Sequence, residues 1–519
     1  MDVLPEQPIA GFAPGAGTDS NRRHAPLAMD ADEFRQAGFA LVETIAEFLD
    51  SLPDRPVTPA LDPADLRRRL DSDAPLPRTG EDAVDLLSST AKLLFDTSLF
   101  NGHPRFLGYV TSSPAHIGML AELLAAAVNP NVGAWTLSPA ATEIEAQTIR
   151  WIAELIGYTT DCGGILVSGG NMANFVGVLA ARAAIPGRNV REAGVQPGSL
   201  PPLRIYASTE THTWIQKAAD LFGLGTDSIR WIATDHAGRL DVDKMAARIR
   251  ADAQAGDHPF LAVGTAGSVS TGIVDPLGEI GTACRELGLW FHVDGAYGGL
   301  AAAAPGSAPE LQELSQADSL AVDPHKWLYA PIEAGCALVR DASKLRDAFA
   351  YHPPYYHFGR EVTNYVDYGP QNSRGFRALK VWLAFRQVGL DGYRRMIGDD
   401  IALAERLLRN VAAHPDLEAH ARGLSIVTFR YVPPHLASLR DTPDGAQRLN
   451  SLNELLVDRI QRSGEAFVSQ AIVGDRFFLR ACIVNFNTTA VDVDALPTIV
   501  ARLGRECERL QEPGTGVRG

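Results

Sequence analysis

Cysteine and long apolar runs are both scarce in this chain. Its five cysteines are scattered and odd in number, at Cys162, Cys284, Cys336, Cys482 and Cys507. This pattern argues against a disulfide framework and a zinc site, and it suits a reducing compartment. No run approaches the roughly 20 apolar residues of a membrane helix, and the N-terminal stretch lacks the basic and apolar regions of a signal peptide. We therefore expect a cytoplasmic protein with no membrane partner and no metal.

Basic residues are outnumbered by acidic ones. Lys and Arg total 47 against 62 Asp and Glu, which gives a formal net charge of -15. An acidic chain repels phosphate backbones, so we expect no nucleic-acid partner. Hydrophobic residues make up 46% and charged residues 21% of the chain. This composition excludes global disorder and allows a sizeable core.

The pattern of residues divides the chain into four segments. Residues 1–28 are rich in Gly, Pro and Ala without periodicity, which predicts a disordered extension. Residues 29–100 predict helices: Asp30 and Glu33 resemble a capping box, and apolar residues from Phe34 to Phe48 recur at spacings of three and four. Residues 101–395 predict a large α/β domain, and residues 396–519 predict a smaller α+β domain.

Short apolar runs alternate with helical patterns between about residues 90 and 345. Several are apolar at consecutive positions, as expected for strands covered on both faces, and their alternation with helices predicts a mainly parallel sheet. The runs are GILVSG (164–169), RIYAS (204–208), SIRWIA (228–233), LAVGT (261–265), LWFHVD (289–294), SLAVD (319–323) and CALVR (336–340). Ligands of such sheets bind beyond the carboxyl ends of the strands, so the polar residues there are candidate site residues.

Three of these strand ends fit one cofactor. SGGNMAN places Gly169 and Gly170 at the start of a helix, whose free backbone N–H groups could hold a phosphate. HVDGAYGG ends a strand on Asp294, a carboxylate that could keep a pyridine nitrogen protonated. DPHKWL places Lys326 where its amine could hold an aldehyde as a Schiff base. Each is ordinary alone, as a turn, a cap or a solvated lysine, but together they predict a site for pyridoxal 5'-phosphate (PLP).

The ordered set of motifs resembles the group II PLP-dependent amino-acid decarboxylases, the family of aromatic-L-amino-acid, histidine and glutamate decarboxylases. The resemblance runs from about residue 29 to 510 and includes HPRFLGYVTSSPAHIGMLAELL, SPAATEIE, SGGNMANFVGVLAAR, HVDGAYGG, DPHKWL and RGFRALKVWLAFRQVGLDGY. It implies an α/β fold of the PLP-dependent transferase type (fold type I, aspartate-aminotransferase-like), with an N-terminal helical segment and a small C-terminal α+β domain. It also implies a homodimer, with residues 29–100 packed on the partner.

The resemblance also implies roles for individual residues. Lys326 matches the Schiff-base lysine, and Asp294 matches the partner of the pyridine nitrogen. Ala296 matches the small residue under the ring, and His212 the histidine that stacks on it and contacts substrate. The other matches are Gly170 and Asn171 in the phosphate loop, Asp323 and His325 before the lysine, and Thr111 in the substrate pocket. The family often has Asn where Asp323 stands. Because a carboxylate repels a phosphate, the alternative role of Asp323 is to orient a neighbouring group.

A tyrosine after the lysine strand bears on the reaction type. In the family, a loop tyrosine returns a proton to the substrate carbon after carbon dioxide leaves. The corresponding stretch here is YHPPYYHFGREVTNY, in which Tyr355 is the best match and Tyr356 the adjacent alternative. A phenol is neutral at pH 7 and can donate such a proton. In plant relatives, loss of this tyrosine accompanies aldehyde synthesis, so Tyr355 favours simple decarboxylation.

The resemblance implies decarboxylation of an L-amino acid, with an aromatic one (tyrosine, DOPA, tryptophan or phenylalanine) favoured, to the amine and carbon dioxide. Gly133 stands near a position where the animal aromatic enzymes have phenylalanine, so a glutamate-like or branched-chain substrate stays open. An aromatic aldehyde synthase is a close alternative, and a non-catalytic binding protein on the same fold is a distant one. Retention of Asp294 and Lys326 argues against the latter. A nicotinamide dehydrogenase is disfavoured because SGGNMAN lacks G-x-G-x-x-G spacing.

Overall fold

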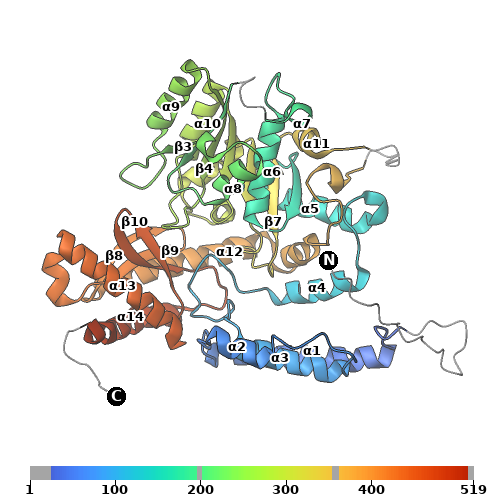
Figure 1. Cartoon of the computed structure of the whole chain (residues 1–519), viewed down its shortest axis with the longest axis vertical. Helices are drawn as coiled ribbons and strands as arrows, with labels where there is room; N and C mark the ends of the chain where they lie inside the picture. The colour runs from blue at the N-terminus through green and yellow to red at the C-terminus, as the bar shows by residue number, and fades with distance from the viewer. Residues whose placement is uncertain (1–24, 196–200, 353–361, 512–519) are drawn as a thin grey trace, which may run out of the picture. The chain divides into compact units, whose positions relative to one another are not determined.

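The computed structural model describes residues 25–195, 201–352 and 362–511 (Figure 1). The chain forms two compact units, one of residues 1–52 and 63–97 and the other of residues 53–62 and 98–519. The predicted extension of residues 1–28 lies almost entirely outside the described residues. Among the residues that are described, no helix is both long and apolar enough to cross a membrane.

The first unit contains three helices, α1 (Ala31–Ser51), α2 (Pro63–Leu70) and α3 (Ala83–Thr97). The predicted capping box begins α1: the Asp30 carboxylate accepts hydrogen bonds from two backbone N–H groups of the first turn, and the Glu33 carboxylate accepts one from the Asp30 backbone. Helices α1 and α3 pack together, with the Phe48 and Phe95 rings stacked 4.0 Å apart. The helix predicted from the amphipathic pattern of residues Phe34 to Phe48 is therefore confirmed as α1.

The second unit is built on a seven-stranded sheet, and each of the seven predicted runs is one of its strands. They are β1 (Gly163–Val167), β2 (Leu203–Ser208), β3 (Ile229–Ile232), β4 (His258–Thr265), β5 (Trp290–Asp294), β6 (Ser319–Val322) and β7 (Gly335–Val339). Their order is β1-β7-β6-β5-β4-β2-β3, and β7 is antiparallel to both of its neighbours. The other six strands run in one direction, which confirms a mainly parallel sheet and gathers six carboxyl ends at one edge.

Helices cover both faces of this sheet. The helices that contact its strands are α5 (Pro139–Leu155), α6 (Gly170–Ala183), α9 (Val242–Gln254), α10 (Leu277–Leu287) and α11 (Ser343–Phe349). Helices α7 (Val190–Ala193) and α8 (Trp214–Leu221) pack against α6, and α4 (His116–Val128) packs against the long helix α12 (Ala378–Ala413). Gly177 of α6 lies against His292, whereas Gly281 of α10 lies against Phe291, the preceding residue of β5. Because successive strand residues point to opposite faces, α6 and α10 lie on opposite sides of β5. Both glycines leave room for these close approaches.

The C-terminal part of the second unit is an antiparallel sheet of order β10-β11-β9-β8 with helices packed on it (Figure 1). Its elements are β8 (Leu417–Gly423), β9 (Ile426–Tyr431), α13 (Pro443–Ser463), β10 (Ser469–Val473), β11 (Arg476–Cys482) and α14 (Ala490–Gln511). The long helix α12 (Ala378–Ala413) joins the two sheets and contributes to both cores. The predicted boundary at residue 395 falls inside this helix.

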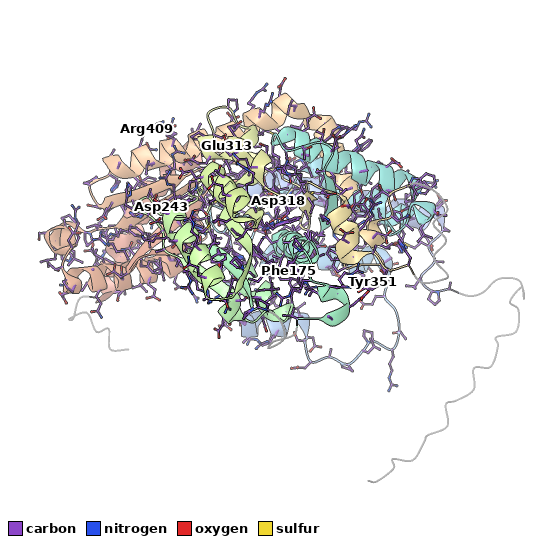
Figure 2. The ribbon with its side chains drawn as sticks, turned by 90° about the horizontal axis from the view of Figure 1, so that it is seen from above. Phe175, Asp243, Glu313, Asp318, Tyr351 and Arg409 are labelled. Atoms are coloured by element: carbon purple, nitrogen blue, oxygen red, sulfur yellow. The ribbon has the colours of Figure 1, made fainter. Side chains whose placement is uncertain are left out.

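An open groove of about 600 Å³ lies on the outside of the second unit, between α9, α10 and the 3-10 helix η5 (Pro309–Gln316). Asp243 of α9 and Glu313 of η5, both labelled in Figure 2, line it together with Glu279 and Glu286. None of its lining residues belongs to the cavity at the strand ends. The groove is thus an acidic surface feature apart from the candidate site.

Candidate active site

A cavity of about 400 Å³ lies where the parallel strands end. Loops after β1, β2, β5 and β6 and the end of β4 supply nearly all of its walls. Its lining residues are Val110, Ser168, Gly169, Gly170, Asn171, Asn174, His212, Trp214, Thr265, Gly267, Val269, Asp294, Ala296, Tyr297, Asp323, His325 and Lys326. The structure therefore brings together eight of the predicted site residues: Gly170, Asn171, His212, Asp294, Ala296, Asp323, His325 and Lys326.

The turn after β1 presents the start of α6 to the cavity. Gly169 has φ +119°, a backbone conformation that suits glycine, and it lets the chain turn sharply from the strand into the helix. A Cβ atom at Gly170 would lie 2.8 Å from Oδ2 of Asp323 and 2.9 Å from Cβ of Ala296, so only glycine fits there. The first N–H groups of a helix lack partners within the helix. The turn can therefore accept an anionic group such as a phosphate.

Asp294 is the last residue of β5 and is buried at the floor of the cavity. Its Oδ2 accepts a hydrogen bond of 2.7 Å from Nε1 of Trp214, and its Oδ1 accepts one of 3.2 Å from the backbone N–H of Ala296. Thr265, the last residue of β4, pairs with Asp294 in the sheet register. Two N–H donors thus stabilise the negative charge of this carboxylate.

Lys326 lies in the turn after β6, beside Asp323. Its Nζ is 3.0 Å from Oδ2 of Asp323, and Nε2 of His325 is 3.6 Å from the same oxygen. The backbone N–H of Ala334 donates to Nδ1 of His325, and burial lowers the pKa of this imidazole, although Asp323 opposes the shift. Asp323 therefore contacts the amine of Lys326 directly, as its alternative role of orienting a neighbour requires.

His212 enters the cavity from the loop between β2 and α8. Its Nδ1 accepts a hydrogen bond of 3.3 Å from the backbone N–H of Trp214. Burial lowers its pKa and the nearby Lys326 lowers it further, while Asp294 raises it. The neutral imidazole is therefore the favoured form, with its proton on Nε2.

Two of the residues singled out in the sequence, Thr111 and Gly133, do not line this cavity, and a third call lies on residues that the structure does not describe. Thr111 does not line it, although its neighbour Val110 does, and Ser112 Oγ donates a 2.7 Å hydrogen bond to the carbonyl of His325. Tyr355 and its alternative Tyr356 lie outside the described residues. Gly133 does not line the cavity either. A Cβ atom there would lie 2.3 Å from the carbonyl oxygen of Asn372, so close packing explains this glycine.

Trp214, Thr265 and Asn174 are among the residues of the cavity wall that sequence reasoning missed. Trp214 follows His212 by two positions, so the motif around the histidine contains it, but no sequence signal links it to Asp294. Thr265 ends a predicted strand, which could have drawn attention to it. Asn174 lies one turn after Asn171 on the same helix, and its Oδ1 lies 2.8 Å from Nε2 of the buried His292. The pairings of Trp214 with Asp294 and of Asn174 with His292 depend on the order of strands in the sheet, which the sequence does not reveal.

The cavity fits the predicted cofactor. Oδ1 of Asp323 and Oγ1 of Thr265 are buried and lack a hydrogen-bond partner among the described residues. Polar atoms that are buried in a cavity without a partner mark places where a ligand is expected. The cavity is surrounded by the Lys326 amine, the Asp294 carboxylate, the His212 ring and the start of α6 at Gly170. These groups match the aldehyde, the ring nitrogen, the ring face and the phosphate of PLP.

Comparisons with known proteins agree with this site. Residues 63–432 match the pyridoxal-dependent decarboxylase conserved domain. An aromatic-L-amino-acid decarboxylase of Bacillus atrophaeus is 32% identical over 92% of this chain and 97% of its own length. A 4-hydroxyphenylacetaldehyde synthase of Rhodiola rosea is 30% identical over 90% of this chain and 94% of its own. The crystal structure of Oryza sativa TDC with PLP and tryptamine aligns with a TM-score of 0.85 at 27% identity, covering 93% of this chain and 99% of that one.

Proposed function

Since this chain belongs to the pyridoxal-dependent decarboxylase family and is a PLP-dependent amino-acid decarboxylase, we propose that its substrate is an aromatic L-amino acid. The reaction converts tyrosine, DOPA, tryptophan or phenylalanine to the corresponding amine and carbon dioxide. The extent of the match to the Bacillus atrophaeus enzyme, which covers nearly both full lengths, supports this substrate class.

The observation that carries the proposed site is the meeting of Lys326, Asp294 and His212 around one cavity. These residues come from the ends of three strands that are far apart in sequence. A scaffold protein needs none of them, whereas a PLP site needs all three. We assign Lys326 to the cofactor aldehyde, Asp294 to the ring nitrogen, His212 to one ring face and Ala296 to the other.

When bound, PLP supplies an electron sink, which accepts the electron pair of the Cα–carboxylate bond as carbon dioxide leaves. The chain's own residues bind and orient the reactants. The Asp294 carboxylate, which accepts hydrogen bonds from two N–H donors, would face the ring nitrogen and favour its protonated form. Neutral His212 covers the ring without adding a positive charge. The start of α6, with Gly170 and Asn171, holds the phosphate, and His325 lies beside Gly169 in the same wall.

Proton transfers complete the reaction. The amine of Lys326 would hold the cofactor between turnovers, and it would carry a proton when the amino group of the substrate takes its place. Asp323, 3.0 Å away, holds the ammonium of Lys326 while it is displaced. We assign Tyr355 to the return of a proton to Cα, because its phenol can donate at neutral pH. Thr111 remains a candidate for contact with the substrate.

The substrate assignment is tested by incubating purified holoenzyme with each proteinogenic L-amino acid and with DOPA. Carbon dioxide release and mass spectrometry of the products are measured together. We expect the highest kcat/KM with an aromatic amino acid and the matching amine as product. A preference for glutamate or a branched-chain amino acid would overturn the aromatic assignment while leaving the decarboxylase chemistry in place.

Aldehyde synthesis is a second candidate outcome, favoured by the similarity to the Rhodiola rosea synthase. In aldehyde synthesis, oxygen and water are consumed, and aldehyde, ammonia, hydrogen peroxide and carbon dioxide are formed in equal amounts. The tyrosine at position 355 favours the amine instead. Equal yields of peroxide and carbon dioxide would assign this chain to aldehyde synthesis.

We also propose a cytoplasmic homodimer. All five cysteines are unpaired, as is usual in a reducing compartment. Large apolar side chains are exposed along one face of α4, at Leu120, Leu123, Leu124 and Val128, and on α1, at Phe34, Phe39 and Val42. Exposed apolar faces of this kind commonly mark subunit contacts. Sedimentation should give twice the chain mass, and deletion of residues 29–100 should abolish PLP binding or activity. A monomeric, active truncation would contradict the dimer.

A further inference from the structure

Trp214 connects the two groups to which the cofactor ring is assigned. Its indole Nε1 donates to Oδ2 of Asp294 at 2.7 Å, and its backbone N–H donates to Nδ1 of His212 at 3.3 Å. We propose that Trp214 is a positioning residue that fixes Asp294 and His212 relative to each other, and thereby sets the affinity and orientation of the cofactor ring. This inference rests on the ring-binding roles proposed above for Asp294 and His212.

The indole N–H acts on a carboxylate that has little contact with water. Asp294 is 7% exposed and Trp214 is fully buried. A hydrogen bond to a buried charged group is stronger than one between neutral groups. With Trp214 on one oxygen and the Ala296 backbone on the other, the carboxylate is held against rotation about its side-chain bond. Loss of the indole N–H leaves Oδ2 without its donor.

The backbone of the same residue determines which nitrogen of His212 carries the proton. Because Nδ1 accepts a hydrogen bond from the Trp214 N–H, the neutral ring bears its proton on Nε2. Trp214 is also the first residue of α8, so the start of this helix places the indole and the imidazole together. One residue thus controls both the floor and one face of the proposed ring site.

The indole of Trp214 is packed against a second buried ring, that of His292. Its ring meets the His292 ring edge-on at 5.7 Å. His292 is fixed in turn by Ser319 Oγ at 2.7 Å and by Asn174 Oδ1 at 2.8 Å. The amide of Asn174 can only accept at Oδ1, so His292 donates from Nε2 and accepts from Ser319. A tryptophan packed in this way can hold its N–H at a fixed position.

The test compares removal of this indole N–H with removal of another. Trp214→Phe keeps an aromatic ring and removes the donor. Replacement of Trp214 by 3-benzothienylalanine removes the N–H while preserving the ring shape, which covers the case in which the phenylalanine variant folds poorly. Trp382→Phe is the matched control, because its Nε1 also donates at 2.7 Å, to Gln147 Oε1. Neither Trp382 nor Gln147 lines the cavity.

The readout is the dissociation constant of PLP, from the visible absorbance of holoenzyme after serial dilution, together with the visible circular dichroism of the bound cofactor. We expect both Trp214 variants to weaken PLP binding about tenfold, as for loss of one charge-assisted hydrogen bond. Their circular dichroism per bound cofactor should fall, and Trp382→Phe should change neither. Unchanged affinity and circular dichroism in both Trp214 variants would overturn the proposal.

A double-mutant cycle separates an effect through Asp294 from a loss of packing. Asp294→Ala should weaken PLP binding by itself, and Trp214→Phe in that background should add less than about twofold. A full tenfold loss in the Asp294→Ala background would mean that Trp214 acts independently, and would overturn the proposal. If Asp294→Ala alone leaves PLP binding unchanged, the assigned role of Asp294 fails first.

Discussion

The phenol of Tyr329 donates a 2.8 Å hydrogen bond to Oδ2 of Asp400, which is buried on α12. The backbone N–H of Tyr329 donates to the carbonyl of Lys326, so this pair ties the lysine turn to the long helix. Burial raises the pKa of Asp400 to about 8, and the hydrogen bonds from Tyr329 and the Asn485 backbone offset only part of this shift. The folded protein therefore holds a proton on Asp400 at neutral pH.

The raised pKa of Asp400 predicts a stability that falls with rising pH. In the unfolded chain the pKa of an aspartate is about 4. Between about pH 4 and pH 8 the folded state therefore binds one proton more than the unfolded state. The contribution of Asp400 to the free energy of unfolding is fully present below about pH 4, and it is lost as the pH rises through about 8. From pH 6 to pH 8, the wild type should lose about 2 kcal/mol more unfolding free energy than Asp400→Asn.

Urea denaturation of both proteins at pH 6 and pH 8 measures this difference. Asp399→Asn, at the exposed neighbouring position, is the control and should follow the wild type closely. Parallel losses in the wild type and in Asp400→Asn would contradict a protonated Asp400.

Gly170→Ala should damage the phosphate end of the cofactor site. The added Cβ would lie 2.8 Å from Oδ2 of Asp323 and 2.9 Å from Cβ of Ala296, so these groups must shift. Overpacking of this kind costs about 1–3 kcal/mol, and if this strain opposes PLP binding the affinity should fall by about 5- to 150-fold. Gly398→Ala is the control, since a Cβ there meets nothing within 4 Å. Absorbance titration with PLP measures both variants, and wild-type affinity in Gly170→Ala would argue against this phosphate site.

Tyr355→Phe should redirect the reaction. Without the phenol, protonation of Cα slows, and amine formation should fall about 100-fold, within the usual range for a general acid. Aldehyde and hydrogen peroxide should rise in the same assay. Tyr356→Phe, the adjacent substitution, should change amine formation less than about threefold. If the two variants exchange these behaviours, Tyr356 is the acid, and if neither changes the product, the proton comes from elsewhere.

Much of this fold could be predicted from local patterns of the sequence. The seven strands of the large sheet are buried runs of apolar residues, and such runs can be recognised without tertiary context. The capping box at Asp30 and Glu33 acts within three residues and was likewise predictable. Lys326, Asp294 and Gly170 could be named because parallel strands bring their carboxyl ends to one edge.

The contacts that the sequence did not predict depend on the order of strands in the sheet. Trp214 and Asp294 are 80 positions apart and meet because β4 alone separates β2 from β5. The pairing of Asp400 with Tyr329 depends on where α12 crosses the lysine turn. Gly133 was noted in the sequence for its bearing on the substrate, but in the structure it packs against the backbone of Asn372, which is more than 200 positions away in the sequence.

Covalent attachment of PLP to Lys326 is the proposal on which the other site assignments depend. Borohydride reduction of the purified holoenzyme, followed by proteolysis and mass spectrometry, tests it most directly. We expect loss of the visible absorbance and a reduced cofactor attached to the peptide that contains Lys326, with no such label in Lys326→Ala. Attachment to another lysine of the wild-type protein, or the absence of any attached cofactor, would contradict it.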